Sequence, residues 1–366
     1  MAKARIRTNW PTLVALFVSC AYVLWRLSAS GWDPVSLAEL GSRYAGSVQA
    51  DTEGYDGQFT YYLALDPNPS TVEKRLDVPA YRYQRILYPI LARVISVGDL
   101  SIIPWALLAI NVVAHAIGTW AVTQFLVDHD LWQGYALIYG LWVGLVVGVG
   151  LDLSGPLAYA LVVTGWLLYH RRHYLLGASL IGLALFTKET SLLFWFPLLL
   201  SELLQKRSWR TISGLYAGGI LFVGWQLWLW REFGAPGLGS GGAMATPFEW
   251  IPYMGLWRIG PISMATLGLY LLMFGPTIVL PSAWGVFHSL RALRRGEIYA
   301  ETWALLINTL FIVVMPFSTF REPLSILRVA AGMVVAVILY AAKRGDKRVL
   351  NYGMFWAPLL VVLLKG

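Results

Sequence analysis

Long apolar runs recur along this chain, and the short segments between them hold most of its charges. Hydrophobic residues make up 57% of the sequence and charged residues only 13%, whereas a soluble domain carries about 25% charged residues. The chain also has 18 tryptophans and 19 tyrosines, and these aromatic side chains are typical of membrane–water interfaces. The composition therefore predicts an all-α polytopic membrane protein.

A membrane-spanning helix needs about 20 apolar residues. On this measure we expect about eleven transmembrane segments within a single integral membrane domain, residues 1–366. Several segments near the middle are short, and two of them could be half-helices or re-entrant. The expected segments are 10–27, 101–127, 135–150, 157–169, 174–187, 190–204, 211–230, 262–289, 301–319, 324–342 and 350–364.

The basic N-terminus sets the expected orientation. Lys3, Arg5 and Arg7 precede the first apolar run without a small-residue cleavage site after it, so we expect a retained first span. With this end in the cytoplasm, four of five internal cytoplasmic loops are basic, as the positive-inside rule requires. The loop at 128–130 is the exception. The net charge of +8 therefore fits membrane orientation, and nucleic acid is not an expected partner.

Two long loops are then expected on the outer, extracytoplasmic face, at about residues 28–100 and 231–261. The first is too long to be a mere connector. Within it, segment 86–97 is too short to span, and we expect an amphipathic helix at the interface, with Arg85 and Arg93 directed towards headgroups. The second loop has a Gly/Ala-rich front that we expect to be mobile. A scaffold role is more plausible for the second loop than for the first.

The stretch GYDGQFTYY, residues 54–62, places the carboxylate of Asp56 between glycines and tyrosines. A lone aspartate in a loop is usually a turn residue. Here the same loop also supplies Arg82 and Arg85, and arginine is well suited to bidentate phosphate binding. The combination predicts a reaction on a phosphate-linked substrate, with the glycines allowing a ligand to approach the backbone. The flanking side chains are candidate substrate contacts: Tyr55, Gln58, Tyr61 and Tyr62.

Three further outer features are candidates. Asp152, in GVGLDLSGP, is equally a helix cap or a second acid of the same site. Lys188 and Glu189, in TKET, are a capping turn with mutual neutralisation, or a phosphate contact. Arg321 and Arg328 lie seven residues apart and hence on one helical face. They are expected to clamp a phosphate or pyrophosphate, although snorkelling to headgroups would also explain them.

No sequence motif indicates a cofactor. GxGxxG, Walker A and HExxH patterns are absent, so neither a nucleotide nor a zincin mechanism has support. The single cysteine, Cys20, excludes a disulfide framework. Asp51 and Glu53 are the acids nearest to Asp56, and their offset does not support a divalent cation site. We therefore expect no metal ligands, and leave open whether a divalent cation assists.

The stretches GYDGQFTYY, the LDP that follows, RYQRILYP and TKET resemble a bacterial group of GT-C superfamily integral membrane glycosyltransferases linked to cell-surface glycopolymer formation. The resemblance covers most of the chain, and its specific part is the first outer loop and the TKET turn. It implies a bacterial inner membrane as the location and a polyprenyl-phosphate-linked sugar as donor, with Asp56 as catalytic base or organiser and Asp152 as the second outer-loop acid. Many members carry adjacent acids, whereas Gly57 follows Asp56 here, which favours a single base.

The leading hypothesis is an inverting glycosyltransferase at the extracytoplasmic face. It would move a sugar from polyprenyl phosphate to a glycan, lipid or protein acceptor. Membrane lipid would surround the protein. One alternative is a non-catalytic binder or translocator of lipid-linked sugars. Another is a structural subunit of a larger membrane complex, with the aromatic loops as contact surfaces.

Overall fold

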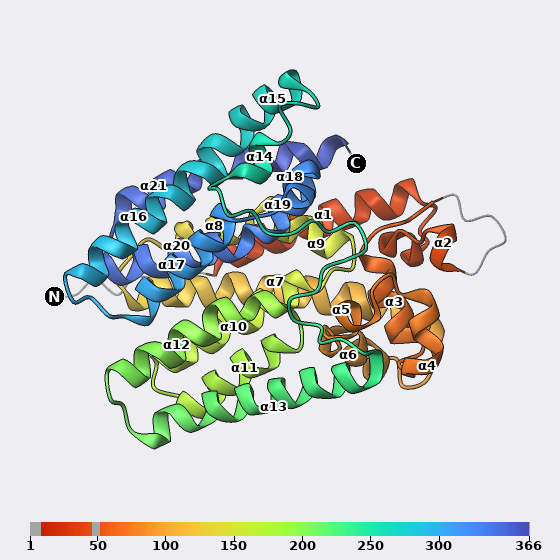
Figure 1. The fold of residues 1–366 in the computed structure, drawn as a ribbon, viewed down its shortest axis with the longest axis horizontal. Coiled ribbons are helices and arrows are strands. Elements are labelled where there is room, and N and C mark those ends of the chain that lie inside the picture. The colour runs from red at the N-terminus through yellow and green to blue at the C-terminus, as the bar shows by residue number, and fades with distance from the viewer. Residues whose placement is uncertain (1–8, 46–51, 366) are drawn as a thin grey trace.

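The computed structural model describes residues 9–45 and 52–365. Lys3, Arg5, Arg7 and Asp51 lie outside the described residues. Within the described ranges the secondary structure is helical, without a β-strand, and Figure 1 shows the longer helices lying side by side. The all-α prediction is therefore confirmed for this part of the chain.

The α-helices carry the labels of Figure 1. They are α1 (Trp10–Ala29), α2 (Ser42–Ala45), α3 (Gly57–Leu65), α4 (Pro69–Val72), α5 (Pro79–Tyr83), α6 (Leu87–Ile95), α7 (Ile103–Asp128), α8 (Leu137–Gly140), α9 (Val143–Gly150), α10 (Gly155–His170), α11 (Tyr174–Leu185), α12 (Leu192–Leu204), α13 (Trp209–Phe233), α14 (Met254–Trp257), α15 (Met264–Phe274), α16 (Leu280–Arg294), α17 (Ala300–Val313), α18 (Phe317–Arg321), α19 (Pro323–Val329), α20 (Ala331–Arg344) and α21 (Lys347–Met354).

Several helices are long and apolar enough to span a membrane. Among the described residues there are five, or six if the bent pair α8–α9 counts as one span. They are Trp10–Ala29, Leu100–Asp128, Trp209–Phe233, Met264–Arg294 and Pro323–Arg344, with Gln133–Gly140 and Val143–Gly150 as the bent pair. The membrane character of the chain is thus supported, whereas the expected number of eleven spans is not confirmed. The other apolar segments are helical but shorter.

The expected span at 135–150 is broken between α8 and α9, which meet at a bend of 54°. Trp142 lies at the break in an extended conformation, and its indole Nε1 donates a hydrogen bond to the Leu327 carbonyl at 2.8 Å. Gly144 packs so closely on the Leu327 backbone that an added Cβ would lie 2.2 Å from the carbonyl oxygen. Contact with α19 therefore accompanies the break, and a half-helix in this region agrees with the expectation from its short apolar run.

Helix α20 lies at the centre of the largest hydrophobic core, and all its residues from 331 to 342 are buried. Its sequence is apolar on every side, which is the pattern of a helix surrounded by others. By contrast, α1 and α13 expose many large hydrophobic side chains, as lipid-facing helices do. The ends of α10, α12 and α20 carry the basic residues 171–172, 206–207 and 343–344.

The first long loop folds into the short helices α2–α6, which gather at one end of the molecule in Figure 1. The predicted helix in segment 86–97 is present as α6. The prediction that Arg85 and Arg93 point towards lipid headgroups is wrong. Arg93 donates hydrogen bonds to the carbonyls of Ala64 and Leu65, and Arg85 binds a carboxylate inside the protein. Both guanidinium groups bind protein acceptors because backbone carbonyls and an acid lie within reach.

Candidate functional site

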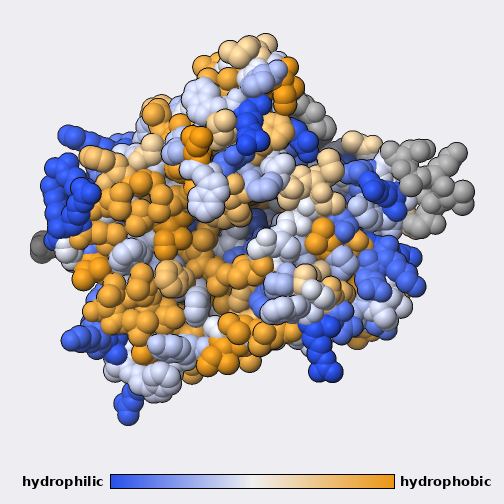
Figure 2. Space-filling model, viewed as in Figure 1, coloured by the Kyte–Doolittle hydropathy of each residue, from blue (hydrophilic) through white to orange (hydrophobic). Residues whose placement is uncertain are grey.

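A cavity of about 690 Å³ lies where the first long loop meets the helix ends. Figure 2 shows a hollow near the middle of the molecular face, with hydrophobic residues spread over one side of it. Six segments line the cavity, and most of them are far apart in the sequence. They are the stretch from Glu53 to Leu63, the α5 region, the α9–α10 turn, residues 188–193, the loop at 238–248 and the α17–α19 region. The first long loop thus forms one wall of this cavity.

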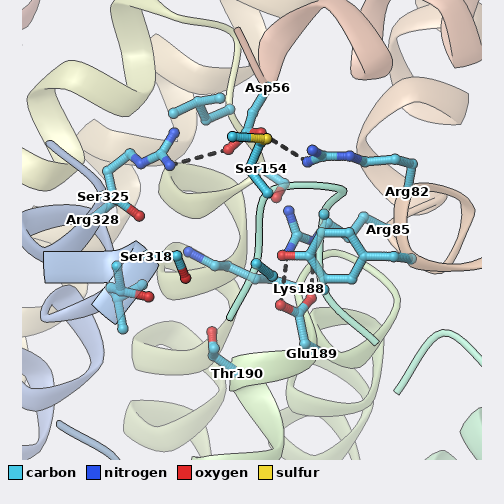
Figure 3. Close-up of a pocket in the computed structure, with 18 of the residues that line it drawn as sticks. Asp56, Arg82, Arg85, Ser154, Lys188, Glu189, Thr190, Ser318, Ser325 and Arg328 are labelled. Carbon is cyan, nitrogen blue, oxygen red and sulfur yellow. Dashed lines mark hydrogen bonds and ion pairs between the residues drawn. The ribbon is translucent and has the colours of Figure 1, made fainter. Parts of the chain in front are cut away.

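Asp56 lies in this cavity between two arginines from distant elements. Its Oδ1 is 2.9 Å from Nη1 of Arg82, on α5, and its Oδ2 is 3.1 Å from Nη2 of Arg328, on α19. Figure 3 shows the carboxylate between the two guanidinium groups. Asp56 precedes α3 but makes no capping hydrogen bond with its side chain. The carboxylate is therefore committed to the arginines, and the turn interpretation explains its backbone position but not its side chain.

The charges around Asp56 set its basicity. Burial by itself raises the pKa of its carboxyl, but attraction by Arg82, Arg328 and Arg85 outweighs burial and holds the pKa well below its usual range. A carboxylate with so low a pKa is a weak base while both arginines hold it. The structure thus places Asp56 in the cavity as an ion-paired, weakly basic carboxylate.

Arg82 is held in place by a second carboxylate. Asp77 binds its Nε and Nη2 atoms at 2.6 and 2.8 Å, which leaves Nη1 for Asp56. Oδ2 of Asp77 also accepts a hydrogen bond from the backbone N–H of Ala243, in the second long loop. The guanidinium lies 4.1 Å from the centroid of the Phe59 ring. These contacts fix the direction in which Arg82 presents its remaining N–H groups.

Arg85 and Glu189 form the second buried ion pair of the cavity. Arg85 Nε and Nη2 contact the two carboxylate oxygens of Glu189 at 2.8 and 2.6 Å, and Nη2 also donates to the hydroxyl of Tyr81. The expected mutual neutralisation of Lys188 and Glu189 is thus wrong. The bidentate partner of Glu189 is Arg85, 104 positions away.

Lys188 extends into the cavity, and in Figure 3 its amine points away from Glu189 towards Ser318 and Arg328. The amine makes no hydrogen bond or ion pair with another described residue, and it lies 5.6 Å from the centroid of the Tyr159 ring. Burial and the positive charges of Arg85 and Arg328 lower the pKa of the Lys188 amine to about 8. An amine in this position is a ready partner for an anionic ligand.

The other predicted contacts divide into two groups. Tyr55 lines the cavity, with its ring 4.8 Å from the Arg328 guanidinium, and its hydroxyl donates to Glu322. Arg321 also lines it and is exposed. The expected single helical face of Arg321 and Arg328 is wrong, because α18 ends at Arg321 and α19 begins after the extended Glu322. Gln58 touches the cavity, but its amide group binds the backbone of Gly41 and Glu53. The two remaining tyrosines, Tyr61 and Tyr62, are not among the lining residues and pack in hydrophobic clusters.

Asp152 does not line the cavity with Asp56. It is completely buried behind the lining, with φ of 50° and with both carboxylate oxygens lacking a hydrogen-bond partner among the described residues. Burial raises the pKa of this carboxyl well above its usual range. Its neighbours Leu153 and Ser154 do line the cavity. The predicted pairing of Asp152 with Asp56 in one site is therefore not formed, because the turn directs the side chain inward.

The glycines around Asp56 serve contacts within the protein. A Cβ on Gly57 would lie 2.2 Å from the Leu151 carbonyl oxygen, and one on Gly54 would lie 2.3 Å from the backbone nitrogen of Gly41. Gly54 also has φ of 67°, a conformation that favours glycine. The expectation that a ligand approaches these glycines is therefore wrong. Their backbone packs closely on other backbone segments, and this packing brings Asp56 to the cavity.

The second long loop is part of the site, which the sequence did not indicate. Residues 234–253 cross the face of the molecule between α13 and α14 (Figure 1), and residues 238–248 line the cavity. Hydrogen bonds hold the loop at Asp77 and at Ser318, whose Oγ accepts from the Thr246 backbone at 3.0 Å. Asp77 carried a detectable signal, an acid shortly before the Pro-initiated helix of Arg82. The loop's Gly/Ala-rich composition carried none.

Within the described residues, no group of three or more His, Cys, Asp or Glu side chains is placed to hold a metal ion. The cavity presents the Lys188 amine and the guanidinium groups of four arginines, and the carboxylates among its lining residues are those of Glu53, Asp56, Asp77, Glu189 and Glu322. Such a set can bind a phosphate through charge-assisted hydrogen bonds. No family model, curated protein or solved structure matches this chain, and the interpretation of its function therefore rests on the site itself.

Proposed function

We propose that the protein is a membrane glycosyltransferase that moves a sugar from a polyprenyl-phosphate donor to an acceptor at the extracytoplasmic face, in the formation of cell-surface glycan or glycoconjugate. The observation that carries the proposal is the meeting of Asp56, Arg328 and Lys188 in one cavity at the ends of apolar helices. Lys188 lacks an anionic partner among the described residues, and a phosphate would supply one.

In the proposed reaction, Asp56 removes the proton from an acceptor hydroxyl. The acceptor oxygen then forms a bond to the anomeric carbon, with inversion. The bond from that carbon to the phosphate oxygen breaks, and polyprenyl phosphate leaves with the electron pair. Arg82, Arg328 and Lys188 stabilise the charge that develops on the phosphate. The phosphate is a good leaving group, so the mechanism needs no acid catalyst.

The arrangement of charge along the helices favours an extracytoplasmic site. Residues 171–172, at the end of α10, are basic, and the cavity lies at the opposite, N-terminal end of the same helix. Helix α20 likewise ends in Lys343 and Arg344, while Arg328 lies at the cavity. Basic ends are usually cytoplasmic, so the cavity would face outward. The prenyl chain could then remain in the membrane while its phosphate enters.

Purified protein in proteoliposomes tests this function directly. We expect a short-chain prenyl phosphate to raise the thermal unfolding midpoint, because ligand binding stabilises the native state, and the matching prenyl alcohol to leave it unchanged. We also expect at least one member of a panel of polyprenyl-phosphate-linked sugars to yield free polyprenyl phosphate. Absence of both effects would refute the proposal. Binding without turnover of any donor would favour the binder or translocator instead.

Affinity for the prenyl phosphate is expected to depend on pH through Lys188. Its pKa of about 8 in the folded protein means that the amine is charged below pH 8 and neutral above it. Affinity should therefore be highest near pH 7 and fall by roughly tenfold or more at high pH, the value of a hydrogen bond to a charged group. Titration calorimetry between pH 7 and 9.5 measures this change.

Lys188→Arg is the matched control for this titration, because arginine stays charged throughout the range. Its affinity should be nearly independent of pH, and Lys188→Gln should show the weak affinity at every pH. A wild-type affinity that stays constant from pH 7 to 9.5 would show that Lys188 does not contact the phosphate.

A further inference from the structure

The base of the proposed reaction is unavailable in the structure as it stands. Asp56 has both carboxylate oxygens engaged, one with Arg82 at 2.9 Å and one with Arg328 at 3.1 Å. The same two guanidinium groups are the ones that would hold the phosphate of the donor. A carboxylate and a phosphate oxygen need the same N–H donors of these arginines, so the two anions compete for one position.

We propose that the donor phosphate displaces Asp56 from Arg82 and Arg328, and that this exchange of anions releases the carboxylate to act as base. The inference rests on the proposed function and adds a regulatory step to it. Asp56 becomes reactive only after the donor is bound, so the acceptor hydroxyl is deprotonated only when a sugar is in place to receive it.

The partners of the three cations show which contacts can exchange. Arg82 keeps the bidentate contact with Asp77 whether or not Asp56 is present. Arg328, in contrast, has Asp56 as its only carboxylate within ion-pair distance among the described residues. Lys188 has none among them. A phosphate with access to Nη1 of Arg82, Nη2 of Arg328 and the Lys188 amine would thus gain a third cation that Asp56 does not contact.

The Asp56 side chain can also move away from the two arginines without losing other contacts. Its side chain makes no capping hydrogen bond to α3, so a rotation away from the arginines breaks no other contact of the carboxylate. About a third of the side chain is exposed to the cavity, 31%, which gives it space to turn. Once the arginines are neutralised by phosphate, the burial that already acts on Asp56 raises its pKa, and the carboxylate becomes a stronger base.

The exchange predicts that removing the acid improves binding. Asp56→Asn should bind a short-chain prenyl phosphate more tightly than wild type, by roughly tenfold, because the ligand no longer displaces a charged partner. Asp77→Asn is the matched control. This substitution also removes one negative charge that contacts Arg82. Asp77 lies outside the position that the phosphate takes, and it orients Arg82. The affinity of Asp77→Asn for the prenyl phosphate should therefore be equal to that of wild type or weaker.

Titration calorimetry on the two variants and wild type decides the matter, with Glu53→Gln as a second control if Asp77→Asn does not fold. Glu53 lines the cavity and pairs with the exposed Arg43, so this variant should bind as wild type does. Tighter binding by Asp56→Asn alone supports the exchange. Equal tightening by a control would show a general charge effect and overturn it, as would an unchanged affinity of Asp56→Asn. A wild type that fails to bind any prenyl phosphate would refute the proposed function as well.

Discussion

Asp56→Asn is expected to lower the rate of sugar transfer by roughly 10²–10⁴-fold, the usual contribution of a positioned base. Asparagine keeps the size of the side chain and the approach to Arg82 and Arg328, but it cannot accept the proton of the acceptor hydroxyl. The loss should therefore appear in kcat. The KM for the donor should fall or stay constant, because the competing carboxylate is gone. Initial rates over a range of donor concentrations, with protein reconstituted at equal amounts, measure both constants.

The split between the two constants separates a base from a donor-binding residue. If Asp56 acted by holding the donor, its substitution would raise KM and leave kcat nearly unchanged. Glu53→Gln provides the control, since it removes an acid from the lining of the same cavity without touching the two arginines. Its rate should be close to wild type. A stably inserted Asp56→Asn variant that transfers sugar at the wild-type rate would show that the base is another group.

The positions of the helices were largely predictable because apolar runs determine which residues leave water. The runs at 10–27 and 211–230 become the single helices α1 and α13. The number of spans was not predictable from the apolar runs, because it depends on tertiary contacts. The run at 135–150 is apolar throughout, yet it bends where Trp142 bonds the backbone of α19. A hydropathy pattern contains no information on such a contact between residues 185 positions apart.

The candidate site was predictable in part of its membership but not in its pairings. Residue type and expected topology placed Asp56, Arg82 and Arg328 on one face, and the structure brings them together. The partner of Glu189 could not be inferred, because sequence proximity favoured Lys188 and the fold supplies Arg85. The inward turn of Asp152 was equally hidden. A capping turn and a site acid have the same sequence pattern, and only packing decides the direction of the side chain.

The Arg85–Glu189 pair carries a large expected effect on stability. Both side chains are mostly buried, with 17% and 18% of their surface exposed, and Nη2 of Arg85 lies 2.6 Å from Oε1 of Glu189. Glu189→Gln leaves the guanidinium charge without its carboxylate. Loss of one partner of a buried pair costs about 3–5 kcal/mol, and the remaining exposure places this one at about 3 kcal/mol on the same scale. The thermal unfolding midpoint of detergent-solubilised protein should fall accordingly.

Two comparisons show whether burial is the cause. The Arg43–Glu53 pair has the same N···O distance of 2.6 Å, but both side chains are 55% exposed. Glu53→Gln should therefore change the midpoint little, since exposed pairs contribute about 0–1 kcal/mol. The double variant Arg85→Met with Glu189→Gln removes the unpaired charge and should recover much of the stability that Glu189→Gln loses. Equal midpoints for Glu189→Gln and Glu53→Gln would mean that water reaches Arg85 freely. Water in the cavity would then screen the contacts between its cations and a phosphate, because charge pairs in water are weak.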